Sequence, residues 1–334
     1  MHFKNNLAKI ILAWYDNNKR NLPWRVSKYS RKKIYYRILS EFMLQQTQVK
    51  TVLPYFYKFI KKYPTLKSLS KAKEKDVIKL WEGLGYYRRA KNLLLTTKII
   101  SKKKNDFPKN FEDLKELPGI GDYTANALLA FIYNKPKIAF DGNVKRVFSR
   151  LLNKHEENIN FNELVEKNKN NFFKSKRNSD FAEALIEFGA LICKSKNPEC
   201  LNCSLNKNCK YYKSSKKINL KRNNKLNYEK DYDIFCHINN KKQIALTKSN
   251  QLGFLKDFNL PMIKESKSQK ENKNWRFLKN YKNTISNLKL NINLYYKFSN
   301  KIPATYNWYS INYNKEFIPT FTKKILKQVS SIFV

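Results

Sequence analysis

The sequence is short of acidic residues and of histidine. Its 334 residues hold 26 Asp and Glu against 68 Lys and Arg, which gives a formal net charge of +42. The excess is spread over both halves of the chain, so no single tail accounts for it. Such a charge indicates a polyanionic partner, most simply nucleic acid, but it is equally typical of a chain rich in Lys, Asn and Ile throughout. Charge alone leaves both interpretations open.

Long apolar runs are also missing. No stretch approaches the roughly 20 apolar residues that a membrane span needs. The N-terminal "MHFKNNLAKIILAWYDNNKR" has no small-residue cleavage site and is typical of an amphipathic helix. We therefore expect a cytoplasmic protein with no membrane partner, whose five cysteines stay reduced.

The periodicity of the apolar residues divides the chain. Up to about residue 210 the spacing is helical, in segments such as "LAKIILAWYD", "YTANALLAFIY" and "SDFAEALIEFGALIC", and Pro and Gly fall between these segments. From Tyr232 to Ile238 every second residue is apolar, and Leu288 to Leu294 repeat the pattern, which predicts strands with Cys236 in their core. The sequence predicts a mainly α domain at 1–210, a basic linker at 211–228, and a smaller α+β domain at 229–334 that ends in a helix from about Pro319.

Four cysteines are concentrated in "CKSKNPECLNCSLNKNC", at Cys193, Cys200, Cys203 and Cys209. Four thiolates suit a structural zinc ion or a 4Fe–4S cluster. Zinc ribbons usually show two Cys-x2-Cys pairs, whereas this segment has one, and the three histidines form no group that could complete a mixed site. The spacing therefore favours iron–sulfur and leaves zinc as the alternative.

A second informative stretch is "LPGIGDYTANALLAFIY". Pro118, Gly119 and Gly121 predict a tight turn before a helix that opens near Asp122, and such a turn lets backbone N–H groups approach a DNA phosphate. Twenty residues beyond Gly121, Asp141 stands at the start of the next predicted helix. Taken singly, the turn is typical of an ordinary helix connection and the aspartate of a helix cap.

Together with "LPWR", "SEFMLQQTQV", "LWEGLGYYRRAKN" and "DGNVKRV", these stretches resemble the adenine DNA glycosylases of the MutY type, within the helix–hairpin–helix iron–sulfur superfamily. The resemblance runs from about residue 5 to 209. It implies base excision repair of adenine paired with 8-oxoguanine or guanine in double-stranded DNA, and one 4Fe–4S cluster on the four cysteines. It also implies a monomeric bacterial enzyme associated with the nucleoid.

Two alternatives remain. An endonuclease III-like glycosylase with lyase activity would carry a lysine where Tyr123 stands and would lack Glu41. A non-catalytic iron–sulfur DNA-binding protein, or a zinc-bearing nucleic-acid module, would have little need of both Glu41 and Asp141. These positions favour a monofunctional adenine glycosylase.

The resemblance assigns the chemistry to two carboxylates. Glu41 matches the general acid that protonates adenine at N7, and its apolar neighbours predict a pKa raised by burial. Asp141 matches the group that stabilises the sugar cation, assisted by Tyr123 and Asn143. Lys145, one turn beyond Asp141, is expected on DNA phosphate together with the hairpin glycines.

The resemblance also assigns the residues that bind the base and open the stack. An aromatic face and a charged edge suit the reading of a flipped purine. Gln45, Gln46 and Tyr86 match residues that enter the stack. The residues expected around the adenine are Arg20, Leu22, Trp24, Arg25 and Glu183.

The C-terminal part resembles the Nudix-like domain with which this family recognises 8-oxoguanine. "NQLGFLKDFNLP" and "NWYS" carry the likeness, and no run with the paired glutamates of a hydrolytic Nudix box is present. In "TISNLKL", Ser286 matches the recognition loop, whereas Asn287 stands in place of the family's histidine. An asparagine can still bond a carbonyl or a phosphate.

Overall fold

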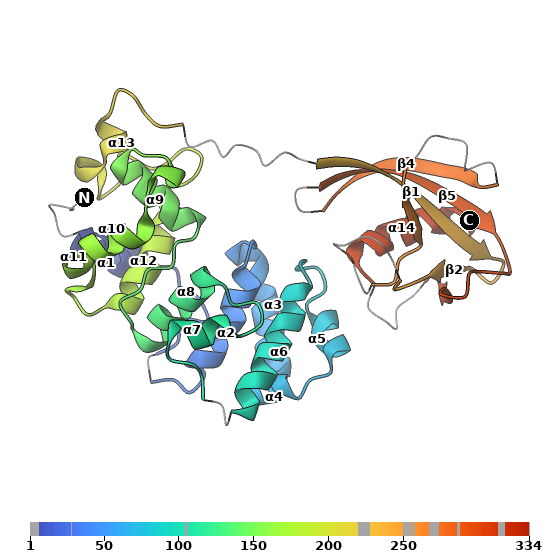
Figure 1. The fold of residues 1–334 in the computed structure, drawn as a ribbon, viewed down its shortest axis with the longest axis horizontal. Helices are drawn as coiled ribbons and strands as arrows, with labels where there is room; N and C mark the ends of the chain where they lie inside the picture. Colours follow the sequence, from blue (N-terminus) through green and yellow to red (C-terminus); the bar gives the residue numbers. More distant parts are fainter. Residues whose placement is uncertain are drawn as a thin grey trace. The chain divides into compact units, whose positions relative to one another are not determined.

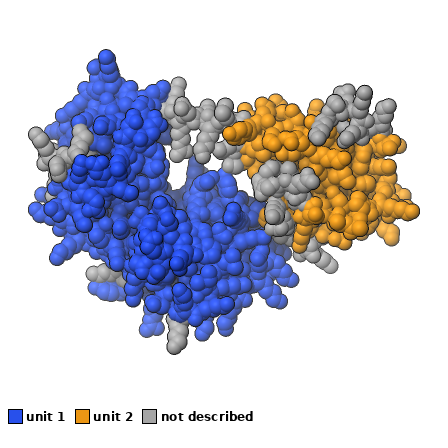
Figure 2. Space-filling view, in the orientation of Figure 1, with its two compact units in different colours: residues 1–220 blue, residues 221–334 orange. Residues whose placement is uncertain are grey.

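The computed structural model describes residues 7–27, 29–103, 106–219, 228–249, 255, 258–266, 274–285, 288–312 and 318–333. The chain forms two compact units, residues 1–220 and 221–334 (Figure 2). The first unit is helical and the second is built on a sheet (Figure 1), which confirms the predicted combination of a mainly α part with a smaller α+β part.

The first unit is organised around two hydrophobic cores. One lies among the helices between residues 33 and 133 and includes the fully buried Phe56, Phe59 and Trp81. The other joins the N-terminal helix to the helices beyond residue 142, around Phe148 and Phe188. The helices of the first unit are α1 (Leu7–Asn18), α2 (Lys33–Leu44), α3 (Val49–Lys62), α4 (Leu66–Ser70), α5 (Glu74–Leu80), α6 (Arg88–Lys102), α7 (Phe111–Lys115), α8 (Asp122–Tyr133), α9 (Gly142–Leu152), α10 (Phe161–Lys167), α11 (Lys169–Phe173), α12 (Asn178–Leu191) and α13 (Lys210–Lys213).

Helix α8 joins the two cores. Its sequence, rich in Ala and Leu, is buried on almost every side, and it contacts both α2 and α12. Ala127, Ala130 and Phe131 of α8 form a small cluster with Ala182 of α12. Small side chains where α8 crosses α12 let these two helices approach closely. This packing brings residues of α2, α8 and α9 close together.

The expectation that Pro and Gly fall between the helices is wrong at two interior positions, and Gly142 opens α9. Pro54 lies inside α3, where it is exposed, as is Lys50 four residues earlier, so water can bond the carbonyl that the missing N–H leaves free. Gly189 lies inside α12, and a Cβ there would come within 2.7 Å of the Asn143 Cβ. The glycine is therefore needed for the close packing of α12 against the start of α9.

The second unit is a mixed six-stranded sheet with a helix on one face. Strand order is β4-β5-β1-β2-β6, with β3 also paired to β1, and β1 runs parallel to β5. Alternate residues of β1, including Cys236, face a core that α14 covers with Ile325 and Val329, as the alternation predicted. The elements are β1 (Tyr228–Asn239), β2 (Gln243–Leu246), β3 (Met262–Glu265), β4 (Arg276–Ile285), β5 (Leu288–Phe298), β6 (Asn307–Ser310) and α14 (Thr320–Ser330).

The segment expected to be a linker is partly ordered. Helix α13 occupies its start, and Asn153 at the end of α9 donates a hydrogen bond to the Lys216 carbonyl and accepts one from the Ile218 N–H. Residues 220–227 lie outside the described part of the chain.

Candidate functional site

Glu41 lies on the buried side of α2. Only 5% of it is exposed, between the fully buried Phe42 and Ser40. Burial raises the pKa of its carboxyl group to about 7, with the charge of Arg37 opposing this rise and those of Glu183 and Asp141 adding to it. A carboxyl group with this pKa is half protonated near neutral pH, so a large fraction of the molecules carry the proton that a general acid donates.

Asp141 caps the N-terminus of α9. Its Oδ1 accepts hydrogen bonds from the backbone N–H groups of Asn143 at 2.8 Å and Val144 at 2.7 Å, and its Oδ2 accepts one from Asn143 Nδ2 at 2.8 Å. Burial raises the pKa of Asp141, and these hydrogen bonds oppose the rise. The carboxylate is thus fixed by three donors.

Tyr123, in the first turn of α8, completes a cluster with the two carboxylates. Burial raises the pKa of its hydroxyl well above the usual value, and the charges of Glu41 and Asp141 raise it further. The charge of Asp141, at the start of α9, therefore acts on Glu41 of α2 and on Tyr123 of α8. Clusters of buried, mutually perturbed acids are typical of active sites.

Arg146 connects this cluster to the cysteine segment. Its guanidinium donates to Asn143 Oδ1 at 2.7 Å, to the Gly189 carbonyl at 2.8 Å and to the Cys193 carbonyl at 2.8 Å. Asn143, which holds Asp141, is therefore itself held between two helices. This arginine was not expected from the sequence, where it stands within "GNVKRV".

A buried network of opposite charges lies around Glu183. Its carboxylate forms ion pairs with Arg25, at 2.5 Å, and with Arg37, and it accepts a hydrogen bond from the Tyr15 hydroxyl at 2.8 Å. Glu183 and Arg37 are both nearly fully buried. Of these residues the sequence analysis identified Arg25 and Glu183 and missed Tyr15 and Arg37.

The network extends through Glu187, one turn further along α12. Arg20 donates to it with Nε and Nη2, the latter at 2.6 Å, and Arg25 donates at 3.0 Å. These bonds lower the pKa of Glu187 against the effect of burial. Leu22 and Trp24, expected in the same pocket, are buried in the core, where Trp24 packs edge-on against Phe56 at 5.2 Å.

The residues expected to approach DNA lie on three neighbouring turns. Gly119 adopts the left-handed φ of +83°, and a Cβ there would meet Phe42 at 2.9 Å. Gln45 donates to the Gly119 carbonyl at 3.2 Å, which joins the hairpin to the end of α2. Gln46 and the exposed Tyr86 have the positive φ values of 56° and 49°. Gly121 caps α8.

Lys145, which was expected to contact a DNA phosphate, has a carboxylate partner within the protein. It forms an ion pair with Glu156 at 2.6 Å. Ser286 and Asn287, expected in the lesion-recognition loop, lie outside the described residues.

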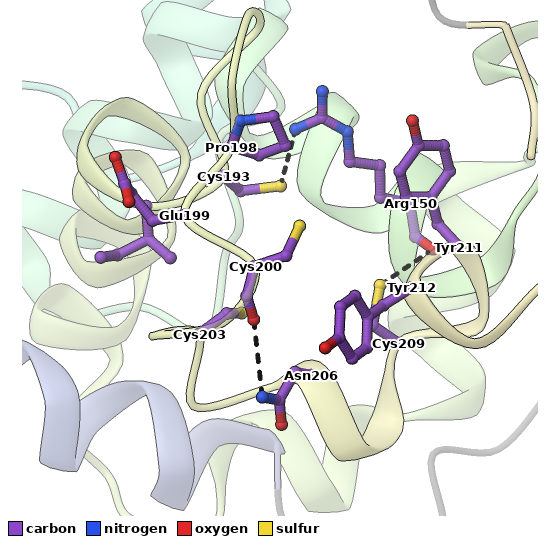
Figure 3. Close-up of a pocket in the computed structure, with 11 residues that line it drawn as sticks. Arg150, Cys193, Pro198, Glu199, Cys200, Cys203, Asn206, Cys209, Tyr211 and Tyr212 are labelled. Atoms are coloured by element: carbon purple, nitrogen blue, oxygen red, sulfur yellow. Dashed lines mark hydrogen bonds between the residues drawn. The ribbon is translucent and has the colours of Figure 1, made fainter.

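The four cysteines Cys193, Cys200, Cys203 and Cys209 line one pocket together with Arg150 (Figure 3). Arg150 donates to the Cys193 sulfur at 3.3 Å, and its carbonyl accepts from the Cys209 thiol at 3.4 Å. Burial and, to a smaller extent, the other three thiols raise the pKa of Cys203 to about 11, against a hydrogen bond from the Leu205 backbone that lowers it. Among the described residues, no three His, Cys, Asp or Glu side chains are close enough to hold one metal ion.

Comparison with known proteins identifies the family. Residues 39–189 match the HhH-GPD superfamily base excision DNA repair protein model. The chain is 37% identical to the adenine DNA glycosylase of Buchnera aphidicola subsp. Baizongia pistaciae (strain Bp), over 96% of this chain and 95% of that protein. The chain belongs to the adenine DNA glycosylase family.

A further relative supports this assignment, and a solved structure supports the fold. The adenine DNA glycosylase of Buchnera aphidicola subsp. Schizaphis graminum (strain Sg) is 39% identical over 67% of this chain and 65% of that protein. A solved thermostable thymine-DNA glycosylase matches 62% of this chain and 94% of its own, with 27% identity and a TM-score of 0.54. The protein is therefore a DNA-binding glycosylase of base excision repair with the helix–hairpin–helix fold.

The donor set of this glycosylase fits an iron–sulfur cluster. Four thiols around one pocket are the donor set that a 4Fe–4S cluster takes. No helix in the described part of the chain is long and apolar enough to cross a membrane.

Proposed function

We propose that this glycosylase removes adenine paired with 8-oxoguanine or guanine from double-stranded DNA. The observation that carries the proposal is the cluster of Glu41, Asp141 and Tyr123, in which burial raises the pKa values of all three groups and the charge of Asp141 raises those of Glu41 and Tyr123 further. Hydrolysis of an N-glycosidic bond needs a proton for the departing base and a negative charge beside the sugar. Glu41 supplies the first and Asp141 the second.

The steps follow from these two environments. The adenine is flipped out of the duplex into the site, at the expense of unstacking. Glu41 gives its proton to adenine N7 as the bond between N9 and C1′ breaks, and the bonding electron pair leaves with the base. The positive charge on the sugar is stabilised by the Asp141 carboxylate. Water then adds to C1′, and its released proton returns to a carboxylate.

The flipped base would be read by the charged network. Arg25 and Glu183 present a donor edge and an acceptor edge that are already paired with each other, so their geometry is fixed before the base enters. Leu22 and Trp24, which are buried in the core, would form the apolar wall of the adenine pocket. Asn143 holds Asp141 in place.

We also propose that the enzyme lacks lyase activity. A lyase needs an amine that attacks C1′, and the position of that lysine in the endonuclease III class is occupied by Tyr123. Lys145, one helical turn beyond Asp141, forms an ion pair with Glu156. The strand should therefore stay intact after the base has left.

Cys193, Cys200, Cys203 and Cys209 would hold one 4Fe–4S cluster. When bound, the cluster would cross-link the segment after α12 and so fix the end of that helix, which carries Glu183 and Glu187. The residues of the chain perform the hydrolysis.

The proposal also covers the oligomeric state, the location in the cell and the role of the C-terminal part. The enzyme would act as a monomer associated with the nucleoid, and residues 229–334 would form the Nudix-like domain that contacts the base opposite the adenine.

A panel of duplexes tests the function. Single-turnover cleavage would be measured on duplexes with A:8-oxoguanine, A:G and thymine glycol, each with and without alkali. We expect adenine release from the first two, with strand scission only after alkali. Scission at thymine glycol without alkali, and none at adenine, would assign the protein to the endonuclease III class instead.

A further inference from the structure

Arg89 is buried in the first turn of α6, where its side chain donates, among the residues that the structure describes, to main-chain carbonyl oxygens. Its Nη1 and Nη2 groups reach five of them, at 2.6 to 3.2 Å. The acceptors belong to two segments that are 40 residues apart in sequence: Phe42, Met43 and Gln45 at the end of α2, and Leu84 and Gly85 in the turn before α6.

Each of these segments continues into a residue with a left-handed backbone. The Gln45 carbonyl, at 2.6 Å from Arg89 Nη1, precedes Gln46 with φ +56°. The Gly85 carbonyl, at 3.1 Å from Nη2, precedes Tyr86 with φ +49°. Non-glycine residues keep this conformation only where the surroundings enforce it. Arg89 bonds the carbonyl immediately before each of them.

The side chain of Tyr86 is held as well. The guanidinium carbon of Arg89 lies 5.4 Å from the centre of the Tyr86 ring and 5.4 Å from that of the buried Trp81. Arg89 itself is only 7% exposed, whereas Tyr86 is 45% exposed. The arginine can therefore influence a bound duplex only through the two turns that it joins.

We propose that Arg89 is a positioning residue that holds the Gln45–Gln46 turn and the Tyr86 turn at a fixed separation, so that both enter the base stack together and extrude the adenine. This rests on the proposed function, which places those side chains in the stack. A planar guanidinium with two forked donor groups can bond both turns at once, whereas a lysine ammonium is a single point donor on a flexible stem. The chemical step itself does not involve Arg89.

The test separates extrusion from chemistry. Arg89→Lys would be compared with Arg88→Lys, the same change at the neighbouring exposed position. Single-turnover adenine release would be measured on an A:8-oxoguanine duplex and on a duplex whose adenine lies opposite an abasic site and has no pairing to lose. We expect Arg89→Lys to be slower by about 100-fold on the first duplex and by no more than about threefold on the second. Arg88→Lys should match the wild type on both.

A second variant guards against loss of folding. Gly85→Ala changes the turn at a glycine with φ +76°, and a Cβ there meets no atom within 4 Å, so only the turn is strained. It should reproduce the selective loss on the paired duplex. Equal losses on both duplexes in folded protein, or no loss in either variant, would overturn the role of Arg89. Absence of adenine release by the wild type would instead refute the proposed function, and the positioning role with it.

Discussion

Arg37 forms an ion pair with Glu183, a residue 146 positions further along the chain. Arg37 also lies one helical turn before Glu41 on α2, so a buried positive charge and its partner stand beside the proposed general acid. The charge of Arg37 lowers the pKa of Glu41 and that of Glu183 raises it. Burial raises the pKa of Glu41 most, and the pair adjusts the pH range in which Glu41 still carries its proton.

This arrangement predicts the pH dependence of the rate. The wild-type rate should fall as pH rises through about 7, because Glu41 loses the proton that it must donate. Arg37→Met removes the charge that favours the ionised form, so the alkaline limb should move up by about one pH unit. Single-turnover rates across the pH range would show the shift. Arg31→Met, at an exposed position, is the control, and an unmoved limb in Arg37→Met would contradict the prediction.

The raised pKa of Glu41 also predicts a stability change with a definite sign. The folded protein holds this proton more tightly than the unfolded chain does, so the stabilisation is complete below the unfolded pKa and is lost as pH rises through about 7. Glu41→Gln cannot ionise. Relative to wild type, its free energy of unfolding should therefore gain roughly 3 kcal/mol more at pH 8.5 than at pH 4. Denaturant unfolding at the two pH values would measure this, and a difference independent of pH would contradict it.

Asn143 gives a prediction for the acid limb. Its side chain donates to Asp141 Oδ2, and this bond lowers the pKa of Asp141. In Asn143→Ala that pKa should rise, so Asp141 becomes protonated at higher pH and the rate should begin to fall at higher pH on the acid side. The same pH series would measure it, with Asn17→Ala on the exposed face of α1 as control. An acid limb identical to that of the wild type would show that Asn143 does not act through Asp141.

Much of this site was predictable from local sequence, and the rest depends on contacts that sequence spacing does not encode. Glu41, Asp141 and the cysteines stand in short stretches whose residues are neighbours along the chain, and the family resemblance of those stretches assigned their roles. The pairing of Arg37 with Glu183 and the reach of Arg89 to two turns join distant segments. Among 68 basic residues, nothing local distinguishes these arginines from exposed ones. Pro54 is tolerated inside α3 because water can bond the Lys50 carbonyl, which has no N–H partner in the helix.

The cysteines make a prediction about metal content. Cys200→Ser should lose the iron and the visible absorbance of an iron–sulfur cluster, because one of four ligands is gone. Cys236→Ala is the matched control, since that thiol is buried in the sheet of the second unit, whereas the other four cysteines belong to the first. Iron and sulfide analysis of both purified proteins would measure how much cluster each one holds. Stoichiometric zinc without iron in the wild type would contradict the cluster.

The most direct test of the account concerns the two carboxylates. Adenine release from an A:8-oxoguanine duplex would be followed in single turnover for wild type, Glu41→Gln, Asp141→Asn and the exposed control Glu112→Gln, with duplex binding measured in parallel. The account predicts that the first two variants bind DNA but release adenine at least about 100-fold more slowly, while the control matches wild type. Either carboxylate variant retaining the wild-type rate would contradict the proposed chemistry.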